Sequence, residues 1–329
     1  MIEKIEPLPK KIPEVLRLAA FQRKLIPFVG AGVSQLGGCP NWNEFANATL
    51  NFFVGEGKLS HAQLNQISSL SSRVKVSVAL ELQKQHALHI NFKKLLEPSV
   101  AKKEIGDEIY ANLSKLATTF VTTNYDDWLD QNPPTPFGAD EAPSQSKPQN
   151  TSRHPFYKHN DISVENLDAP NAVFHIHGSI CDRESMVLTT VDYLNCYSSH
   201  RIDGKGNYEN PFLTFLQTLF RLKNVLFIGY GLNELEVLEY IIQKGIETPP
   251  KNNEEPRHYV LQGFFSHEIE LARSLESYFR QFGIGLLPFS RDERNWDQLV
   301  EVIEYFARKL TPGPPLTLPK RLEMEELLS

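Results

Sequence analysis

Three short apolar runs that each end in small or polar residues constrain most strongly what this chain can fold into. They are Phe28–Ser34, Phe120–Asp126 and Phe174–Ser179. Continuous runs of β-branched and aromatic residues are typical of strands that are buried on both faces of a parallel sheet. Because open parallel sheets bind ligands at the carboxyl ends of their strands, we expect the three ends to meet in one crevice.

Segments with helical periodicity alternate with these runs and with further apolar runs. The expected strands lie at residues 25–29, 118–123, 172–176, 225–228, 258–261 and 284–287, with a shorter extended piece at 186–189. Alternation of helix and strand is typical of parallel sheets. The sequence therefore predicts an α/β fold with three layers, a Rossmann-like parallel sheet of about six strands with helices on both faces.

The length of 329 residues fits one large α/β unit with insertions, although two domains would also fit. We expect a single domain over residues 1–310. Within it, residues 58–116 read as a helical insertion, and residues 132–170 as a flexible loop that is rich in Pro, Ser, Asn and Gln at its start. Residues 311–329 form a Pro-rich linker and a tail that we expect to touch another subunit or to be disordered.

Composition excludes several classes of protein. The 34 basic and 40 acidic side chains give a net charge of −6, which argues against direct nucleic-acid binding. The three cysteines include no Cys-x-x-Cys pair, which argues against a disulfide framework and a thiolate zinc site and favours a cytoplasmic protein. No signal-peptide core and no run of about 18 apolar residues occurs, so no membrane association is expected.

Glycine-rich turns follow two of the expected strands. The backbone of Gly30-Ala31-Gly32 can approach a diphosphate closely, and the helix that follows favours negative charge at its N-terminus. Gln35 stands where the dinucleotide fingerprint of hydride-transferring dehydrogenases has its third glycine, so such an enzyme is disfavoured. The alternative is a glycine turn that serves packing only.

The later turn, Gly229-Tyr230-Gly231-Leu232, offers a second backbone contact to a ribose or a phosphate. Glu234 follows within the first turn of the expected helix. The structural alternative is a glycine-permitted turn with a glutamate that complements the helix dipole.

Polar side chains after the other two runs carry the candidate chemistry. Asn124 can donate to and accept from a ligand or a water, and Asp126 can accept from a ligand amide or hydroxyl, although either could simply cap a turn. His177 is the best general-base candidate among the ten histidines, because Gly178 clears room beside it. His175 should face the opposite side of its strand and have a structural role. No cluster has the spacing of metal ligands.

Together these motifs make the chain similar to the sirtuin family, and more closely to its bacterial sirtuin-like branch found in antiphage defence than to the protein deacylases. Gly30–Ser34 matches the family's Gly-Ala-Gly-x-Ser turn, Asn124–Asp126 its Asn-x-Asp element, His177-Gly178 its His-Gly pair, and Gly229–Leu232 its Gly-x-Ser-Leu turn. The similarity covers roughly residues 26–310. The family's zinc module with its Cys-x-x-Cys pairs is missing.

The resemblance implies an NAD glycohydrolase that cleaves the bond between nicotinamide and ribose and releases ADP-ribose, with NAD as substrate and no zinc. Asn124 would position the ribose or the attacking water, His177 would act as general base or orient a ribose hydroxyl, and Asp126 would hold the carboxamide. The other contacts to NAD that the resemblance implies are Gly30, Ala31, Gly32, Ser34, Thr123, Gly229, Gly231, Leu232 and Glu234.

The same resemblance implies NAD depletion in bacterial antiphage defence, in the manner of abortive infection. The activity would be controlled by assembly into a homo-oligomer or by a partner such as an ATPase or a nucleic-acid-sensing defence protein. Two alternatives stay open: a non-catalytic sensor of NAD or ADP-ribose, and an NAD-dependent protein deacylase or ADP-ribosyltransferase.

Overall fold

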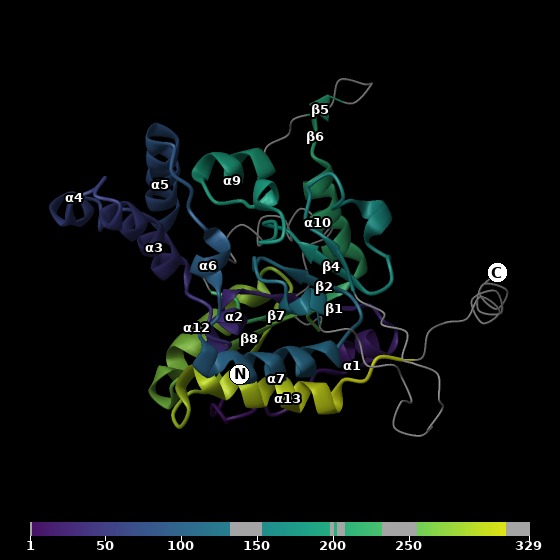
Figure 1. Cartoon of the computed structure of the whole chain (residues 1–329). Coiled ribbons are helices and arrows are strands. Elements are labelled where there is room, and N and C mark those ends of the chain that lie inside the picture. The colour runs from purple at the N-terminus through teal and green to yellow at the C-terminus, as the bar shows by residue number, and fades with distance from the viewer. Residues whose placement is uncertain (1, 132–152, 198–200, 203–207, 232–254, 314–329) are drawn as a thin grey trace, which may run out of the picture.

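A computed structural model describes residues 2–131, 153–197, 201–202, 208–231 and 255–313 (Figure 1). The strands are β1 (Leu25–Val29), β2 (Phe120–Thr122), β3 (His154–Phe156), β4 (Ala172–His175), β5 (Arg201–Ile202), β6 (Tyr208–Glu209), β7 (Asn224–Ile228), β8 (His258–Phe264) and β9 (Ile284–Ser290). The helices are α1 (Glu14–Phe21), α2 (Ala31–Leu36), α3 (Trp42–Gly55), α4 (His61–Gln66), α5 (Ser72–His86), α6 (Phe92–Leu96), α7 (Lys103–Ser114), α8 (Trp128–Gln131), α9 (Thr190–Tyr197), α10 (Pro211–Leu222), α12 (Ile269–Arg280) and α13 (Gln298–Lys309).

The main sheet has seven parallel strands in the order β3-β4-β2-β1-β7-β8-β9. The chain leaves β1 toward β2 on one side, and β7 on the other side of β1 leads on to β8. Strand order therefore reverses between β1 and β7, and this is the point at which open α/β sheets form a ligand crevice. The predicted Rossmann-like α/β fold is confirmed.

The two faces of the sheet are covered by different helices. Along β1, Ile26 and Phe28 face a core completed by α10 and α12, whereas Leu25 and Val29 face a core completed by α1, α7 and α13. These alternating contacts follow from the two-residue period of a strand. In Figure 1, α7 and α13 lie side by side beneath the sheet, and the two helices are in contact.

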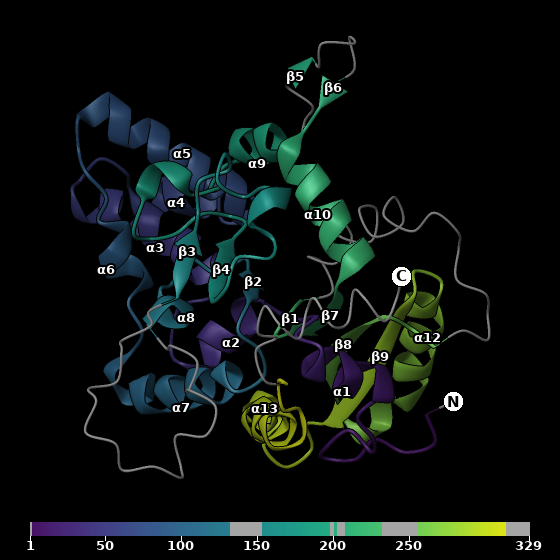
Figure 2. The same ribbon diagram turned by 90° about the vertical axis from the view of Figure 1, so that its right-hand side faces the viewer.

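A third apolar cluster lies within the helical segment that precedes β2. It joins α3, α5 and α6 to Met186 and Leu188, and the helices project at the upper left of the molecule (Figure 2). Helix α3 begins at Trp42 because Asn41 caps it: the Asn41 side chain accepts from Glu44 N at 2.9 Å, and the Glu44 side chain accepts from Asn41 N at 2.9 Å. Helix α7, by contrast, packs on the sheet.

The structure adds to the main sheet one strand that the sequence pattern did not reveal, pairs β5 with β6 in a separate small sheet, and places no strand at 186–189. Strand β3 is only three residues long and pairs with β4 at the edge of the sheet. Pro155 in its middle is compatible with an edge strand, where one side needs no amide donor. Residues 186–188 belong to no strand, and Val187 N donates to His177 O at 2.9 Å instead.

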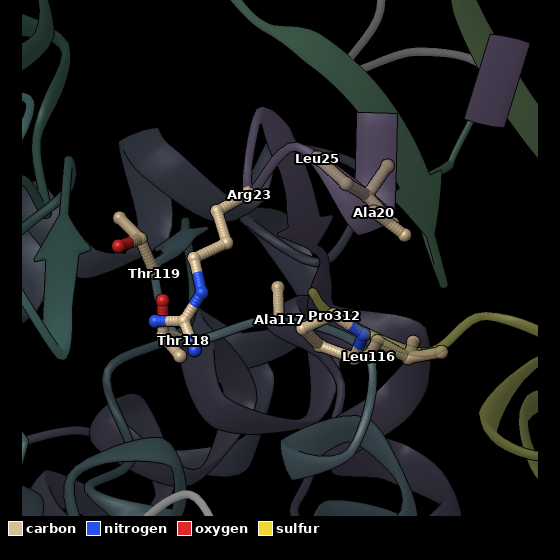
Figure 3. A pocket seen from close by; sticks show the side chains of 8 residues that line it. All are labelled: Ala20, Arg23, Leu25, Leu116, Ala117, Thr118, Thr119 and Pro312. Carbon is tan, nitrogen blue, oxygen red and sulfur yellow. The ribbon is translucent and has the colours of Figure 1, made fainter. Parts of the chain in front are cut away.

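A small pocket lies at the amino end of the sheet, where Arg23 and Leu25 lead into β1 and residues 116–119 lead into β2 (Figure 3). Its volume of about 10 Å³ is the space of roughly one water molecule. Arg23 Nε donates to Gly313 O at 2.8 Å and so ties the end of the described chain to this position. The pocket is too small for a nucleotide and lies at the edge opposite to the crevice. No helix in the described part of the chain combines the length and apolar character needed to cross a bilayer.

His258, at the start of β8, makes the fold sensitive to acid. The residue is 1% exposed, and Nδ1 accepts from Val225 N at 3.2 Å, so protonation at Nδ1 would break this hydrogen bond. Burial, aided by the charge of Arg257, lowers the pKa of His258 to about 3. The unfolded chain therefore binds more protons than the folded chain below about pH 6.5, and stability present at neutral pH is lost as pH falls from about 6.5 toward 3.

We expect urea unfolding to show a loss of about 2 kcal/mol from this histidine between pH 7 and pH 5. In His258→Asn an amide oxygen can replace Nδ1 as acceptor but does not titrate. This variant should be less stable at pH 7 and should lose less stability on acidification than the wild type. Equal acid losses in the two proteins would contradict this account.

Candidate active site

The carboxyl ends of four neighbouring strands are aligned. Val29 pairs with Thr122 on one side and with Ile228 on the other, and Thr122 pairs with His175. The residues that follow these four positions therefore emerge at one edge of the sheet. They are the glycine turn at 30–32, the segment 123–126, His177 and the turn at 229–231. All sequence motifs with candidate chemistry, as far as they are described, lie at this edge.

The two glycine turns pack directly against each other. Gly30 N donates to Ile228 O and Gly32 N to Gly229 O, each at 2.9 Å. A Cβ atom would lie 2.6 Å from Gly229 O at position 30 and 2.8 Å from the same oxygen at position 32. Gly229 itself has a φ of +66°. Packing thus requires these glycines, and the amides of Gly30 and Gly32 are already used within the fold.

The side chain of Asn124 is fixed at this edge. Its Nδ2 donates to Gly30 O at 3.1 Å and to Ser34 Oγ at 2.7 Å, and its backbone amide donates to Thr122 Oγ1 at 3.0 Å. Its Oδ1 is buried and has no hydrogen-bond partner among the described residues, and the same is true of Thr123 Oγ1. Buried polar atoms without a partner cost free energy, and both oxygens lie at the edge where a ligand is expected.

Asp126 is joined to Asn124 through Ser34. The Ser34 hydroxyl donates to Asp126 Oδ2 at 2.6 Å, and Trp128 N lies 3.4 Å from Asp126 Oδ1. Burial raises the pKa of Asp126, and the hydrogen bond from Ser34 opposes this rise. Ser34 also contacts Tyr110 OH at 3.0 Å. The Ser34 side chain therefore organises this network from within the fold.

His177 follows β4 and is partly buried. Its Nε2 lies 3.3 Å from Tyr197 OH at the end of α9, and its ring meets that of Tyr193 edge to face with centroids 6.2 Å apart. Burial, with smaller contributions from Arg73 and His159, lowers the pKa of His177 to about 3. The imidazole is thus neutral throughout the physiological range and serves better as a hydrogen-bond partner than as a strong base.

His175 has a structural environment. It is fully buried, its Nδ1 lies 3.1 Å from Asn124 O, and its Nε2 lies 2.9 Å from Asp130 Oδ1. Burial disfavours the charged ring, but the hydrogen bond and charge of Asp130 outweigh burial and raise the pKa of His175. His175 therefore anchors the backbone of Asn124 to α8.

The structure brings Gly30, Ser34, Asn124 and Asp126 into one hydrogen-bonded network. His177 emerges from the adjacent strand end, but its side chain contacts α9, and no hydrogen bond between described residues joins it to Asn124. In the late turn, Gly229 and Gly231 are described, whereas Leu232 and Glu234 lie outside the described residues.

A cavity of about 800 Å³ adjoins the loop that carries His177. Val187, whose amide donates to His177 O, and Cys196, which precedes Tyr197, are among its lining residues. Neither Asn124 nor His177 is among the described residues that line it, so this cavity is beside the candidate site and is not the crevice at the strand ends. In the part of the chain that the structure describes, no three His, Cys, Asp or Glu side chains are arranged to hold a metal ion.

Sequence reasoning missed three residues of this site. Thr122 Oγ1 accepts from Asn124 N and donates to Val29 O at 2.9 Å, and Tyr197 contacts His177. Tyr110, on α7, is 76 residues from its partner Ser34. The only signal for Tyr110 was an aromatic residue with a hydroxyl in the apolar stripe of an expected helix, which is compatible with any core position.

Comparison with known families agrees with this geometry. The model of the SIR2-like domain matches residues 118–286, which is about half of the chain and includes Asn124 and His177. A search of curated proteins found no match. The chain therefore belongs to the SIR2-like family, an NAD-dependent enzyme family.

Proposed function

We propose that this protein is an NAD glycohydrolase that cleaves the bond between nicotinamide and ribose, with Asn124 and His177 as its catalytic residues. The observation that carries the proposal is the buried amide of Asn124, whose Oδ1 has no partner in the described part of the chain while both protons of Nδ2 are engaged. This oxygen is a preorganised acceptor for a ribose hydroxyl or a water. Preorganised polar groups lower a barrier because they need no reorganisation during the reaction.

Two observations support NAD as the ligand at this edge. Thr123 Oγ1 is a second buried oxygen without a partner among the described residues, and a Cβ atom built on Gly231 would meet none of their atoms within 4 Å, which leaves room for a ligand near its backbone. Gly30, Gly32 and Gly229 would contribute surface to the site, and the amides of Gly30 and Gly32 already donate to Ile228 O and Gly229 O. Ser34 would act by holding Asn124 and Asp126, and we propose Asp126 as the partner of the carboxamide.

NAD supplies a cationic nicotinamide ring that leaves as a neutral molecule when it takes the electron pair of the glycosidic bond. The protein must orient the ribose, exclude bulk water and admit one water whose oxygen bonds to the ribose carbon. Asn124 Oδ1 would accept from that water or from a ribose hydroxyl. The neutral His177 ring would accept from a second hydroxyl, and the released proton would pass to solvent.

We further propose that the activity depletes NAD in antiphage defence in the cytoplasm, and that assembly into a homo-oligomer or a partner protein activates it. The partner could be an ATPase or a nucleic-acid sensor. These finer statements are supported by the resemblance described above. The three cysteines lack a Cys-x-x-Cys pair, and we propose that the reaction needs no zinc.

The purified full chain should convert NAD into equal amounts of nicotinamide and ADP-ribose, measured by chromatography at pH 7.5. Parallel reactions contain an acylated lysine peptide, or a lysate from phage-infected cells as a source of activator. Product that requires the peptide would indicate a deacylase. NAD binding without turnover in every reaction would indicate a sensor, and either result would reject the glycohydrolase.

A further inference from the structure

We infer that Tyr110 is a positioning residue for Asn124, because its hydroxyl donates to Ser34 and so completes the network that orients the catalytic amide. This inference rests on the proposed function. Tyr110 lies on α7 and is fully buried, so it would not touch NAD itself. It would act through Ser34 and through the neighbouring side chain of Asn124.

The directions of the hydrogen bonds follow from what each group can donate. Ser34 Oγ lies 2.7 Å from Asn124 Nδ2, 2.6 Å from Asp126 Oδ2 and 3.0 Å from Tyr110 OH. An amide nitrogen only donates and an ionised carboxylate only accepts. The single proton of Ser34 therefore goes to Asp126, and Tyr110 must donate to the remaining lone pair. Every hydrogen-bonding position of the serine hydroxyl is then filled.

A saturated Ser34 leaves one orientation for the Asn124 amide. Nδ2 faces Gly30 O, which can only accept, and the Ser34 lone pair that Tyr110 leaves vacant. With the amide reversed, Oδ1 would face two acceptors that offer it no proton. Asn124 Oδ1, which no described residue contacts by a hydrogen bond, is thus directed to the reactive edge by a chain of contacts that begins at Tyr110.

The position of Tyr110 is itself fixed by close packing. Its ring packs against Trp128 with centroids 4.8 Å apart. The Trp128 ring in turn lies on two glycines, since a Cβ atom would lie 2.2 Å from it at Gly37 and 2.3 Å from it at Gly106. Burial raises the pKa of Tyr110 well above its ordinary value, so the hydroxyl keeps its proton at neutral pH.

The test is Tyr110→Phe in the full chain, which removes one hydroxyl and keeps the ring. We expect kcat for NAD cleavage to fall about tenfold with KM nearly unchanged, because a network partner is lost and no contact to NAD is removed. The matched control is Tyr305→Phe on α13, a partly buried tyrosine outside the site, which should leave both constants unchanged.

Two further results separate positioning from general destabilisation. If Tyr110 acts through Asn124, Tyr110→Phe causes no further loss of kcat in an Asn124→Ala background. A second tenfold loss of kcat in that background overturns the inference. An unchanged kcat in Tyr110→Phe alone also overturns it. If the wild type cleaves no NAD under any condition, the proposed function fails. The inference is then judged by urea unfolding, where the loss caused by Tyr110→Phe must disappear in a Ser34→Ala background, and an equal loss in both backgrounds overturns it.

Discussion

Replacing Asn124 with alanine is expected to lower kcat for NAD cleavage by about 100- to 1,000-fold, the range typical of removing one preorganised polar group from an active site. The amide is held by Gly30 O and Ser34 Oγ, so its free oxygen needs no reorganisation to meet the substrate. Alanine removes this oxygen and frees one lone pair of Ser34. Initial rates of nicotinamide release over a range of NAD concentrations give kcat and KM.

Two controls show whether the loss is chemical. Asn65→Ala replaces an exposed asparagine on α4 and should not change the rate. Asn124→Asp keeps the size of the side chain, but a carboxylate cannot donate to Gly30 O and would face Asp126 across Ser34. This variant should be as inactive as Asn124→Ala. Asn124→Ala activity within a few-fold of the wild type would exclude Asn124 as a catalytic residue.

The convergence of the sequence motifs at one edge of the sheet could be predicted from the sequence, because it depends on patterns that act locally. Apolar runs without alternation indicate buried parallel strands, and such strands must end at the same edge of a sheet. At that edge the strands are paired in register: Val29 with Thr122 and with Ile228, and Thr122 with His175. The segments that carry Asn124 and His177 therefore start from adjacent strand ends, although 53 positions separate them in the chain.

The partners of each side chain could not be predicted, since they depend on packing between distant segments. Ser34 was expected to contact a diphosphate, and its hydroxyl is instead occupied by Asn124, Asp126 and Tyr110. The glycine turn was expected to let a diphosphate approach its backbone, and nothing in the sequence indicated that the amides of Gly30 and Gly32 donate to Ile228 O and Gly229 O. The low pKa of His177 arises from burial and from Arg73 on α5, and strand pattern carries no information on either.

Gly178→Ala is expected to cause the largest loss of stability, about 3–5 kcal/mol, a large part of the 5–15 kcal/mol that holds a typical domain folded. Gly178 has a φ of +81°, which an alanine adopts only with strain. An added Cβ would also lie 2.1 Å from Ser185 O, a backbone atom that cannot move alone because Ser185 N donates to Asp182 O at 3.1 Å. The unfolding midpoint in urea measures the loss.

The same substitution should reduce NAD cleavage even under conditions in which the protein stays folded. The added Cβ overlaps Ser185 O, and to remove this overlap either His177 or residues 185–187 must shift. These two segments are joined by the hydrogen bond from Val187 N to His177 O. Gly55→Ala is the matched control. The glycine ends α3, and apart from its own helix no described residue lies within 4 Å of its added Cβ. Alanine favours the helix by up to about 1 kcal/mol. If Gly178→Ala unfolds at the same urea concentration as the wild type and as Gly55→Ala, the left-handed turn after His177 does not contribute to the folded protein.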